Sequence, residues 1–511
     1  MESSTIILFV IIPLFAAFLI PIAGRLLPGF QRIVTSSIML VLVVISVLIT
    51  LQKPGTVTYM VGGWEPVEGV PIAIYMVFDG LSGFLLIIIN LLGFLSAFYA
   101  ISYIRRYTGE NFFYTLMCLM IAGMNGVVLS GDLFNLYVFL EISVISSYAL
   151  VAFGVEKTEL EASYKYQVLG GLASLLVLFG IAMLYWKTGT LNIADTAMLL
   201  REGEQDAFLV FVQLILITGF GIKAALIPFH AWLPDAHSSA PSPISAMLSG
   251  VLIKAVGVYV IIRLFFNMFQ LDASLAIVIT VIGALSMVIG VLLAIGQWDL
   301  KRLLAYHSIS QMGYVVIGVG MGMILLARGG DKSVAALAIG GGLFHMINHA
   351  VFKGLLFLNA GAIEYATGTR DMKKMGGLAR YMPVTLTSSF SASMAISGMP
   401  PFNGFFSKLV IIVAAIQGGF YLLAVLAVIA GIITLASFMK FQRYAFYDKP
   451  PGKTEAREVP FSMCFSMVTL AILCLVLSLL IFPGIRQIFL GPAVSTLVES
   501  AEYATKILNL Q

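Results

Sequence analysis

Apolar residues in this chain fall into long runs that short polar segments separate. The run AFLVFVQLILITGF (207–220) carries no charged residue at all. A helix needs roughly 20 apolar residues to cross the hydrocarbon core of a bilayer. The pattern predicts an all-α polytopic membrane protein with about fourteen spans, near 4–24, 32–52, 76–103, 112–130, 132–154, 162–186, 207–230, 241–265, 272–297, 303–326, 334–363, 382–418, 420–446 and 459–482.

Three segments refine this pattern. The run 382–418 is too long for one straight span, and Pro400 and Pro401 within it cannot continue a helix, so we expect two half-helices. The N-terminus lacks the basic region of a signal peptide and is interpreted as the first span. After Pro492 the chain predicts a short amphipathic helix at the membrane surface.

The composition agrees with this class and narrows the chemistry. Of 511 residues, 60% are hydrophobic and 11% are charged, whereas roughly a quarter are charged in a soluble protein. A net charge of +4 offers no basic face for nucleic acid. Cys118, Cys464 and Cys474 lie in apolar runs without CxxC or Cys/His spacing. We therefore expect no metal, no iron–sulfur cluster, no nucleotide and no other cofactor.

The basic residues in the loops predict the orientation in a cell membrane. If the N-terminus is outside, the inner loops hold 17 basic residues and the outer side holds 8, which predicts that both termini are outside. The inner set is Arg25, Arg32, Arg105, Arg106, Lys157, Lys165, Lys301, Arg302, Arg370, Lys373, Lys374, Arg380, Lys440, Arg443, Lys449, Lys453 and Arg457. The outer set is Lys53, Lys187, Arg201, Arg263, Arg328, Lys332, Arg486 and Lys506.

The four remaining lysines, Lys223, Lys254, Lys353 and Lys408, lie inside apolar runs, and Glu141 is the one carboxylate placed as deeply. Each charge at a bilayer centre costs at least ~2.5–3.5 kcal/mol. A lysine can instead extend to the head groups, and Lys353 is the best candidate for that. One static Lys–Glu pair could join helices, but one carboxylate cannot neutralise four lysines. The surplus lysines are then partly neutral, or hydrated in an internal channel.

Histidines accompany these lysines. His345, His349 and Lys353 follow one another at four-residue spacing, which places them on one helix face. A neutral histidine donates at one ring nitrogen and accepts at the other, which suits a proton relay, although a single one can also serve as a helix–helix hydrogen bond. His307 lies near the start of its own span.

Prolines interrupt two of the lysine-bearing runs. Pro228 follows Lys223, whereas Lys408 follows Pro400 and Pro401. The backbone groups freed by such breaks are tolerated only where protein or a water-filled cavity satisfies them. Broken helices at corresponding positions of two halves mark ion sites in transporters, and the reversed order here indicates an inverted repeat.

Several sequence blocks carry a family resemblance. KAALIPFHAWLPDAHSSAPSPISAMLSGVLIKAVGVYVIIR (223–263) resembles the signature of the antiporter-like subunits of respiratory complex I, Mrp-type cation/proton antiporters and energy-converting membrane-bound hydrogenases. Further blocks resemble that family in its own order along most of the chain. They are LYVFLEISVISSYALVAF (136–153), LAYHSISQMGYV (304–315), FHMINHAVFKGLLFLNAGAI (344–363) and SGMPPFNGFFSKLVI (397–411).

The resemblance implies fourteen helices with two inverted five-helix repeats and with helices 7 and 12 broken. It divides the chain into helices 1–3 (1–103), a first repeat of helices 4–8 (112–265), a second repeat of helices 9–13 (272–446), and helix 14 with a surface helix (459–511).

The resemblance also implies roles for the buried residues. Glu141 and Lys223 pair in one half-channel, while Lys254, His345 and His349 lead to Lys408 at the exit of the other. A lysine at 408, where some relatives carry glutamate, favours the Mrp D-type and hydrogenase-type branch. The secondary candidates are Lys353, His307, His230, Pro228, Pro400 and Pro401.

The leading hypothesis is a proton-translocating subunit whose membrane partners supply any redox energy, because this chain has no redox motif of its own. Sodium/proton exchange and a non-conducting scaffold are the alternatives. Whether the chain counts as part of an enzyme depends on its parent complex. The segment 230–245 contains Ser, His and Asp residues, the types that form hydrolytic sites. Its prolines favour a stiffened loop instead.

Overall fold

A computed structural model describes residues 3–52, 55–66, 71–203, 205–449 and 456–508 of the chain. Most of these residues are helical. The strands of the described part form one antiparallel hairpin, β1 (Val57–Met60) and β2 (Tyr75–Phe78), in which Val57 pairs with Phe78. Lys53 and Lys453 of the loop tally lie outside the described residues.

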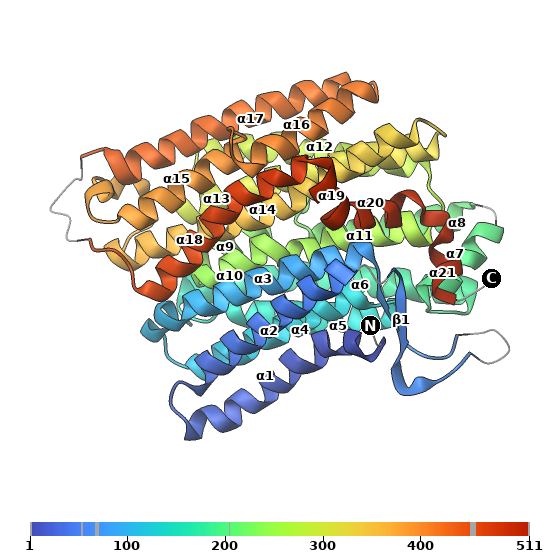
Figure 1. Ribbon diagram of the computed structural model, residues 1–511, viewed down its shortest axis with the longest axis horizontal. Helices are drawn as coiled ribbons and strands as arrows, with labels where there is room; N and C mark the ends of the chain where they lie inside the picture. Colours follow the sequence, from blue (N-terminus) through green and yellow to red (C-terminus); the bar gives the residue numbers. More distant parts are fainter. Residues whose placement is uncertain (1–2, 53–54, 67–70, 204, 450–455, 509–511) are drawn as a thin grey trace.

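Long helices run side by side through the molecule in a single bundle (Figure 1). Twelve helical segments in the described part are long and apolar enough to cross a membrane, which confirms a multi-span membrane protein. They are built on α1 (Leu8–Leu26), α2 (Phe30–Gln52), α3 (Gly80–Tyr103), α4 (Glu110–Leu129), α5 (Leu133–Val151), α6 (Lys157–Thr188), the run α10 (Ser242–Met247), η4 (Leu248–Leu252), η5 (Lys254–Val258), α11 (Tyr259–Arg263) and η6 (Leu264–Met268), then α12 (Ala273–Ile295), α13 (Leu300–Ala327), α14 (Lys332–Thr367), α17 (Tyr421–Gln442) and α18 (Phe461–Val476).

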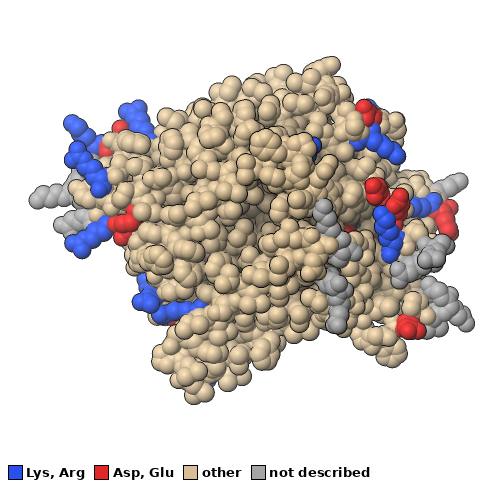
Figure 2. Space-filling model, viewed as in Figure 1, with Lys and Arg blue, Asp and Glu red and all other residues tan. Residues whose placement is uncertain are grey.

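Charged side chains gather at the two ends of the bundle, and a broad band of uncharged surface separates them (Figure 2). Such a band is what hydrocarbon requires of a surface that faces it. We call the end that holds the β1–β2 hairpin the hairpin end, and the opposite end, where α3, α5 and α14 finish, the basic end. The remaining short helical turns are η1 (Ser3–Ile7), η2 (Val61–Gly63), η3 (Ile104–Arg106), η7 (Met372–Lys374), η8 (Leu378–Arg380), η9 (Arg443–Tyr447), η10 (Leu477–Ile481) and η11 (Ser500–Glu502).

Helices stop at both proline sites that the sequence singled out. The helix α8 (Ala207–Lys223) ends at Lys223, and α9 (Trp232–Ser239) begins after a non-helical segment that contains Pro228. Likewise α15 (Pro383–Ser397) ends before Pro400 and Pro401, and α16 (Asn403–Gln417) begins after them. A Cβ atom on Gly404 would lie 1.8 Å from the carbonyl oxygen of Ala395, so only glycine lets these two helices meet this closely.

The C-terminal segment differs from the single surface helix expected after Pro492. It forms α20 (Gly491–Val498), which contains Pro492, and α21 (Tyr503–Leu508). The helix α19 (Pro483–Phe489) precedes them, and the chain runs from α19, near mid-length of the bundle, to α21 beside the hairpin end (Figure 1). The helix α21 packs on α7 (Ile193–Glu202), a short helix that the hydrophobic pattern did not predict. The Arg201 side chain donates to the carbonyl oxygens of Ser500 and Ala501 at 2.6 and 2.5 Å. This segment is therefore held by the bundle.

A buried ion pair also lies near the hairpin end. Arg263, which the loop tally assigned to the outer side, is buried beside Asp79. Its guanidinium donates twice to the Asp79 carboxylate, at 2.6 and 2.8 Å. Burial disfavours the charged carboxylate, but Arg263 and Ser82 outweigh that effect and hold the pKa of Asp79 below its ordinary value. The same carboxylate caps α3 through the amides of Leu81 and Ser82.

Candidate functional site

Glu141, Ser174 and Lys223 form a charged triad, in which Lys223 and Ser174 are buried and Glu141 is partly exposed. They come from α5, α6 and α8, which pack side by side. The Lys223 ammonium lies 3.6 Å from Glu141 Oε1 and donates to Ser174 Oγ at 2.7 Å, and Ser174 in turn donates to Glu141. Lys223 is 3% exposed. The structure thus brings together the predicted pair and adds a serine between its members, a role that no pattern in the sequence signalled.

Lys254 is fully buried in a stretch of wide helical turns, η4 and η5. Its ammonium donates back to the carbonyl oxygens of Ser249 and Gly250, at 2.7 and 2.5 Å. Turns of this kind are frequent at functional sites and leave carbonyl groups free to accept. No carboxylate in the described residues forms an ion pair with Lys254.

The predicted stripe on α14 is also buried. His345 Nδ1 lies 3.0 Å from Ser407 Oγ, and its Nε2 lies 3.2 Å from Gln311 Oε1. The ring nitrogens of His349 have no hydrogen-bond partner among the described side chains and backbone. Lys353 donates to the carbonyl oxygen of Leu304 and is fully buried. The interpretation that Lys353 extends to the head groups is therefore wrong.

Lys408 lies beside the interruption between α15 and α16. Its ammonium donates at 2.7 Å to the carbonyl oxygen of Ile396, in the last turn of α15. It also lies 4.8 Å from the centre of the Tyr314 ring, whose face attracts a cation. The end of a helix carries unsatisfied carbonyl groups and a partial negative charge, so the break supplies an acceptor for this lysine.

Two further histidines share the interior. His307 and His237 are fully buried, and neither has a hydrogen-bond partner at its ring nitrogens within the described residues. The His237 ring stacks on the Phe357 ring, with 4.8 Å between the ring centres. The Lys353 ammonium lies 5.8 Å from the centre of the Phe357 ring. Buried polar groups without a protein partner usually bind internal water. The sequence did not single out His237, because it lies in a segment that resembled a loop.

The other secondary candidates lie apart from this interior. Pro228, Pro400 and Pro401 are exposed at the surface of the chain, and His230 is half-buried. The prolines therefore affect the site by setting where the helices end. Their side chains do not line it.

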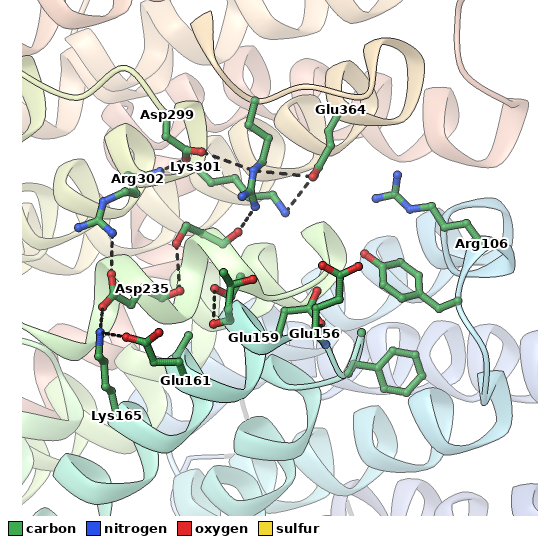
Figure 3. A pocket seen from close by; sticks show the side chains of 18 of the residues that line it. Arg106, Glu156, Glu159, Glu161, Lys165, Asp235, Asp299, Lys301, Arg302 and Glu364 are labelled. Carbon is green, nitrogen blue, oxygen red and sulfur yellow. Dashed lines mark hydrogen bonds and ion pairs between the residues drawn. The ribbon is translucent and has the colours of Figure 1, made fainter.

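A polar cavity of about 900 Å³ opens at the basic end (Figure 3). Its walls carry a network of ion pairs. Asp235 on α9 accepts from Lys165 at 3.0 Å and from Arg302 at 2.6 Å. Arg370 lies 3.4 Å from Asp299 and 3.7 Å from Glu364. Charged walls of both signs keep this space favourable for water and for ions.

Lys301 connects the cavity to the buried interior. The loop tally placed this residue in an inner loop, but its side chain is only 2% exposed. Its ammonium lies 3.2 Å from Glu364 Oε2 and donates at 3.0 Å to the carbonyl oxygen of Ala240. Ala240 closes α9 three residues after His237. A charged group thus lies between the cavity and the histidine that faces Phe357.

The described residues contain no cluster of three or more His, Cys, Asp or Glu side chains placed to hold a metal ion, and the three cysteines are free. The chemistry on offer is that of protonatable groups: an ion pair, further buried lysines and four buried histidines. Such an interior defines a class, the polytopic membrane proteins whose buried charges face the inside of the bundle.

Comparison with known proteins identifies the family. The family model described as NADH:quinone oxidoreductase/Mrp antiporter, transmembrane, matches residues 130–434. The chain is 35% identical over 451 residues to the D-type component of a Na⁺/H⁺ antiporter from Alkalihalophilus pseudofirmus, covering 88% of each. It is 34% identical over 494 residues to the N-type component of the NADH-quinone oxidoreductase from Desulforudis audaxviator, covering 93% of this chain and 95% of the relative.

The fold agrees with that assignment. A chain of the Mrp complex from Dietzia sp. superimposes with a TM-score of 0.88 at 27% identity, covering 99% of this chain and 100% of that one. The chain belongs to the NADH:quinone oxidoreductase/Mrp antiporter transmembrane family, so the resemblance seen in the sequence is confirmed. The two relatives are almost equally similar and do not by themselves separate the branches.

Proposed function

We propose that this chain is a proton-translocating, antiporter-like subunit of a multisubunit membrane complex. The observation that carries the proposal is the charged triad that Glu141 and Ser174 form with the buried Lys223. The other intramembrane lysines of the bundle, Lys254, Lys353 and Lys408, donate to carbonyl groups. Charges inside a membrane bundle mark ion pathways and proton relays.

In this proposal, water in the cavity at the basic end exchanges protons with the interior past Lys301 and His237. Lys254, Lys353 and His349 continue the route, and the bonded pair of His345 and Ser407 leads towards Lys408. A proton that arrives at a neutral Lys223 remakes its ion pair with Glu141, and loss of that proton weakens the pair. The changed field alters the proton affinity of the next lysine. The unpartnered histidine nitrogens support this proposal, because a relay needs water between its side chains.

The finer architecture belongs to the same proposal. The pairs α8/α9 and α15/α16 each act as one broken span, which makes fourteen spans with the twelve long ones. The segments 112–265 and 272–446 form two inverted repeats, and both termini face outside the cell membrane. Partner subunits of an Mrp, hydrogenase-type or complex I-like assembly supply the energy; Lys408 favours the Mrp D-type and hydrogenase-type branch.

Sodium/proton exchange is the second candidate. A specific observation favours it: one relative is named as part of a Na⁺/H⁺ antiporter. Sodium prefers oxygen ligands, and Glu141 with Ser174 offers three side-chain oxygens. The other buried charged groups along the proposed route are lysines, which repel a metal cation. This balance favours protons as the ion that this chain carries.

The test uses the assembled complex in proteoliposomes. Lys223→Ala and Glu141→Ala should each abolish coupled proton transport while the complex still assembles. The matched control is Lys165→Ala, since Lys165 also pairs with a carboxylate but is half-exposed. Normal transport in both variants, or in a variant lacking the charges at 223, 254 and 408, would support a non-conducting scaffold instead. Assays with and without sodium separate the two ions.

A further inference from the structure

A groove of about 450 Å³ lies at the hairpin end, between α14 and the C-terminal helices. One side of α14 forms its floor through Ser333, Leu337, Gly340 and Phe344. The opposite walls come from η10, α19 and α20, and Val410 on α16 closes one side. None of these groups belongs to the proton route proposed above.

The length of the groove matches one leaflet of a membrane. Ser333 lies at the start of α14, and Phe344 lies eleven residues further on. At 1.5 Å per residue the floor is roughly 16 Å long, about half of the ~30 Å hydrocarbon core. Much of the lining is apolar, with Leu337 and Phe344 on the floor and Val494 on a wall. These dimensions suit an acyl chain that enters from the membrane surface.

The lining of the groove carries a cation without a partner. Arg486 on α19 is half-buried, and its guanidinium has no hydrogen bond or ion pair within the described residues. Glu499 also lines the groove, but it is paired with Lys506 at 3.5 Å. A guanidinium without a carboxylate partner is well suited to bind a phosphate through two parallel hydrogen bonds.

A second groove repeats this chemistry. It has a volume of about 500 Å³, lies between α12 and α17, and is almost wholly apolar. Arg328 is the charged residue in its lining, and its side chain has no partner in the described part of the chain. Arg328 follows the last residue of α13, so it lies at the end of the bundle where α14, the floor of the first groove, begins. An apolar groove lined by an arginine without a partner thus occurs twice in the described residues.

We propose that the groove beside α14 binds an anionic phospholipid, with its phosphate on Arg486 and one acyl chain along α14 as far as Phe344. The inner end of the groove touches the relay. Phe344 precedes His345, and Val410 follows Lys408 by two residues on α16. A bound acyl chain would fill the space beside the packing of α14 on α16, which holds His345 to Ser407. The lipid therefore stabilises the second half of the molecule.

Photocrosslinking in the intact complex tests the binding. A benzoyl-phenylalanine at position 337, introduced in cells, should give a peptide adduct with the mass of an anionic phospholipid. Arg486→Gln should lower that adduct roughly fivefold, as expected for loss of one surface charge at an anionic membrane. Arg25→Gln is the control, because Arg25 likewise has no ion pair among the described residues but is exposed and lines neither of these two grooves; it should leave the adduct unchanged.

A second variant fills the groove and keeps Arg486. A Cβ on Gly340 would meet only Val494, at an ordinary 3.5 Å, so Gly340→Leu should assemble and abolish the lipid adduct. An adduct with a partner polypeptide would overturn the proposal and make the groove a subunit interface. Equal lipid adducts with and without Arg486, or no adduct in the assembled parent complex, would also overturn it.

Discussion

Lys223 and Lys408 are both deeply buried, but they are satisfied in different ways. Lys223 has a carboxylate 3.6 Å away and a serine between them. Lys408 has a carbonyl oxygen and the face of a tyrosine ring. Lys254 and Lys353 resemble Lys408, since carbonyl oxygens accept from both. One of these intramembrane lysines thus has a counter-ion, and the other three have none in the described residues.

This difference bears on how each lysine loses a proton. A neutral amine still donates to a carbonyl oxygen, so Lys408 can deprotonate without leaving a buried charge behind. Deprotonation of Lys223 leaves the Glu141 carboxylate with Ser174 as its hydrogen-bond donor. The pair therefore resists deprotonation more strongly than the carbonyl-bound lysines do. In the proton-translocating function that we propose, the pair is the switch and the carbonyl-bound lysines are the relay.

The largest effect that we predict breaks the charge pair. Glu141→Ala leaves Lys223 buried without a counter-ion and should lower the free energy of unfolding by about 3–5 kcal/mol. Thermal unfolding of the purified complex in detergent, followed at several protein concentrations, measures the change. The double variant Glu141→Ala/Lys223→Met removes both charges and should recover most of the loss. Additive losses in the double variant would show that the pair is not coupled.

A smaller and opposite effect is expected for the lysines without a counter-ion. Lys408→Met keeps the length of the side chain and removes the buried charge, so stability should stay the same or rise by ~1–4 kcal/mol. Proton transport should nevertheless be lost. Gains in stability with loss of activity are typical of residues that are kept for function. A loss of stability as large as that of Glu141→Ala would contradict the distinction between the lysine with a counter-ion and those without one.

The hydrophobic pattern predicted much of this molecule, because span length and burial are properties of a local stretch of sequence. The long spans and the four intramembrane lysines followed from it directly. Lys301 and Arg263 did not, because each lies at the end of an apolar run, where a basic residue ordinarily faces solvent. Residues far away in the sequence, Glu364 and Asp79, cover them.

Ser174 shows the same limit within the site. Serine is common in membrane helices, where it usually bonds to its own backbone, and Ser174 does so as well through Gly170. Its second role depends on α5 and α8 lying on either side of it, which no local pattern records. The hairpin and α7 were missed for a related reason: each is short, and tertiary packing holds it in place.

The smallest effect that we predict compares two histidines on one helix. His345 is bonded at both ring nitrogens, whereas His349 has no partner in the described residues. His345→Leu leaves Ser407 and Gln311 with unmatched groups and should cost about 1–2 kcal/mol of stability. His349→Leu should change stability by roughly 0.5 kcal/mol or less, because it displaces water and leaves no protein partner unmatched. Both should slow proton transport if the stripe on α14 is a relay. Thermal unfolding and transport assays on the same preparations check this, and full transport in His349→Leu would remove that histidine from the route.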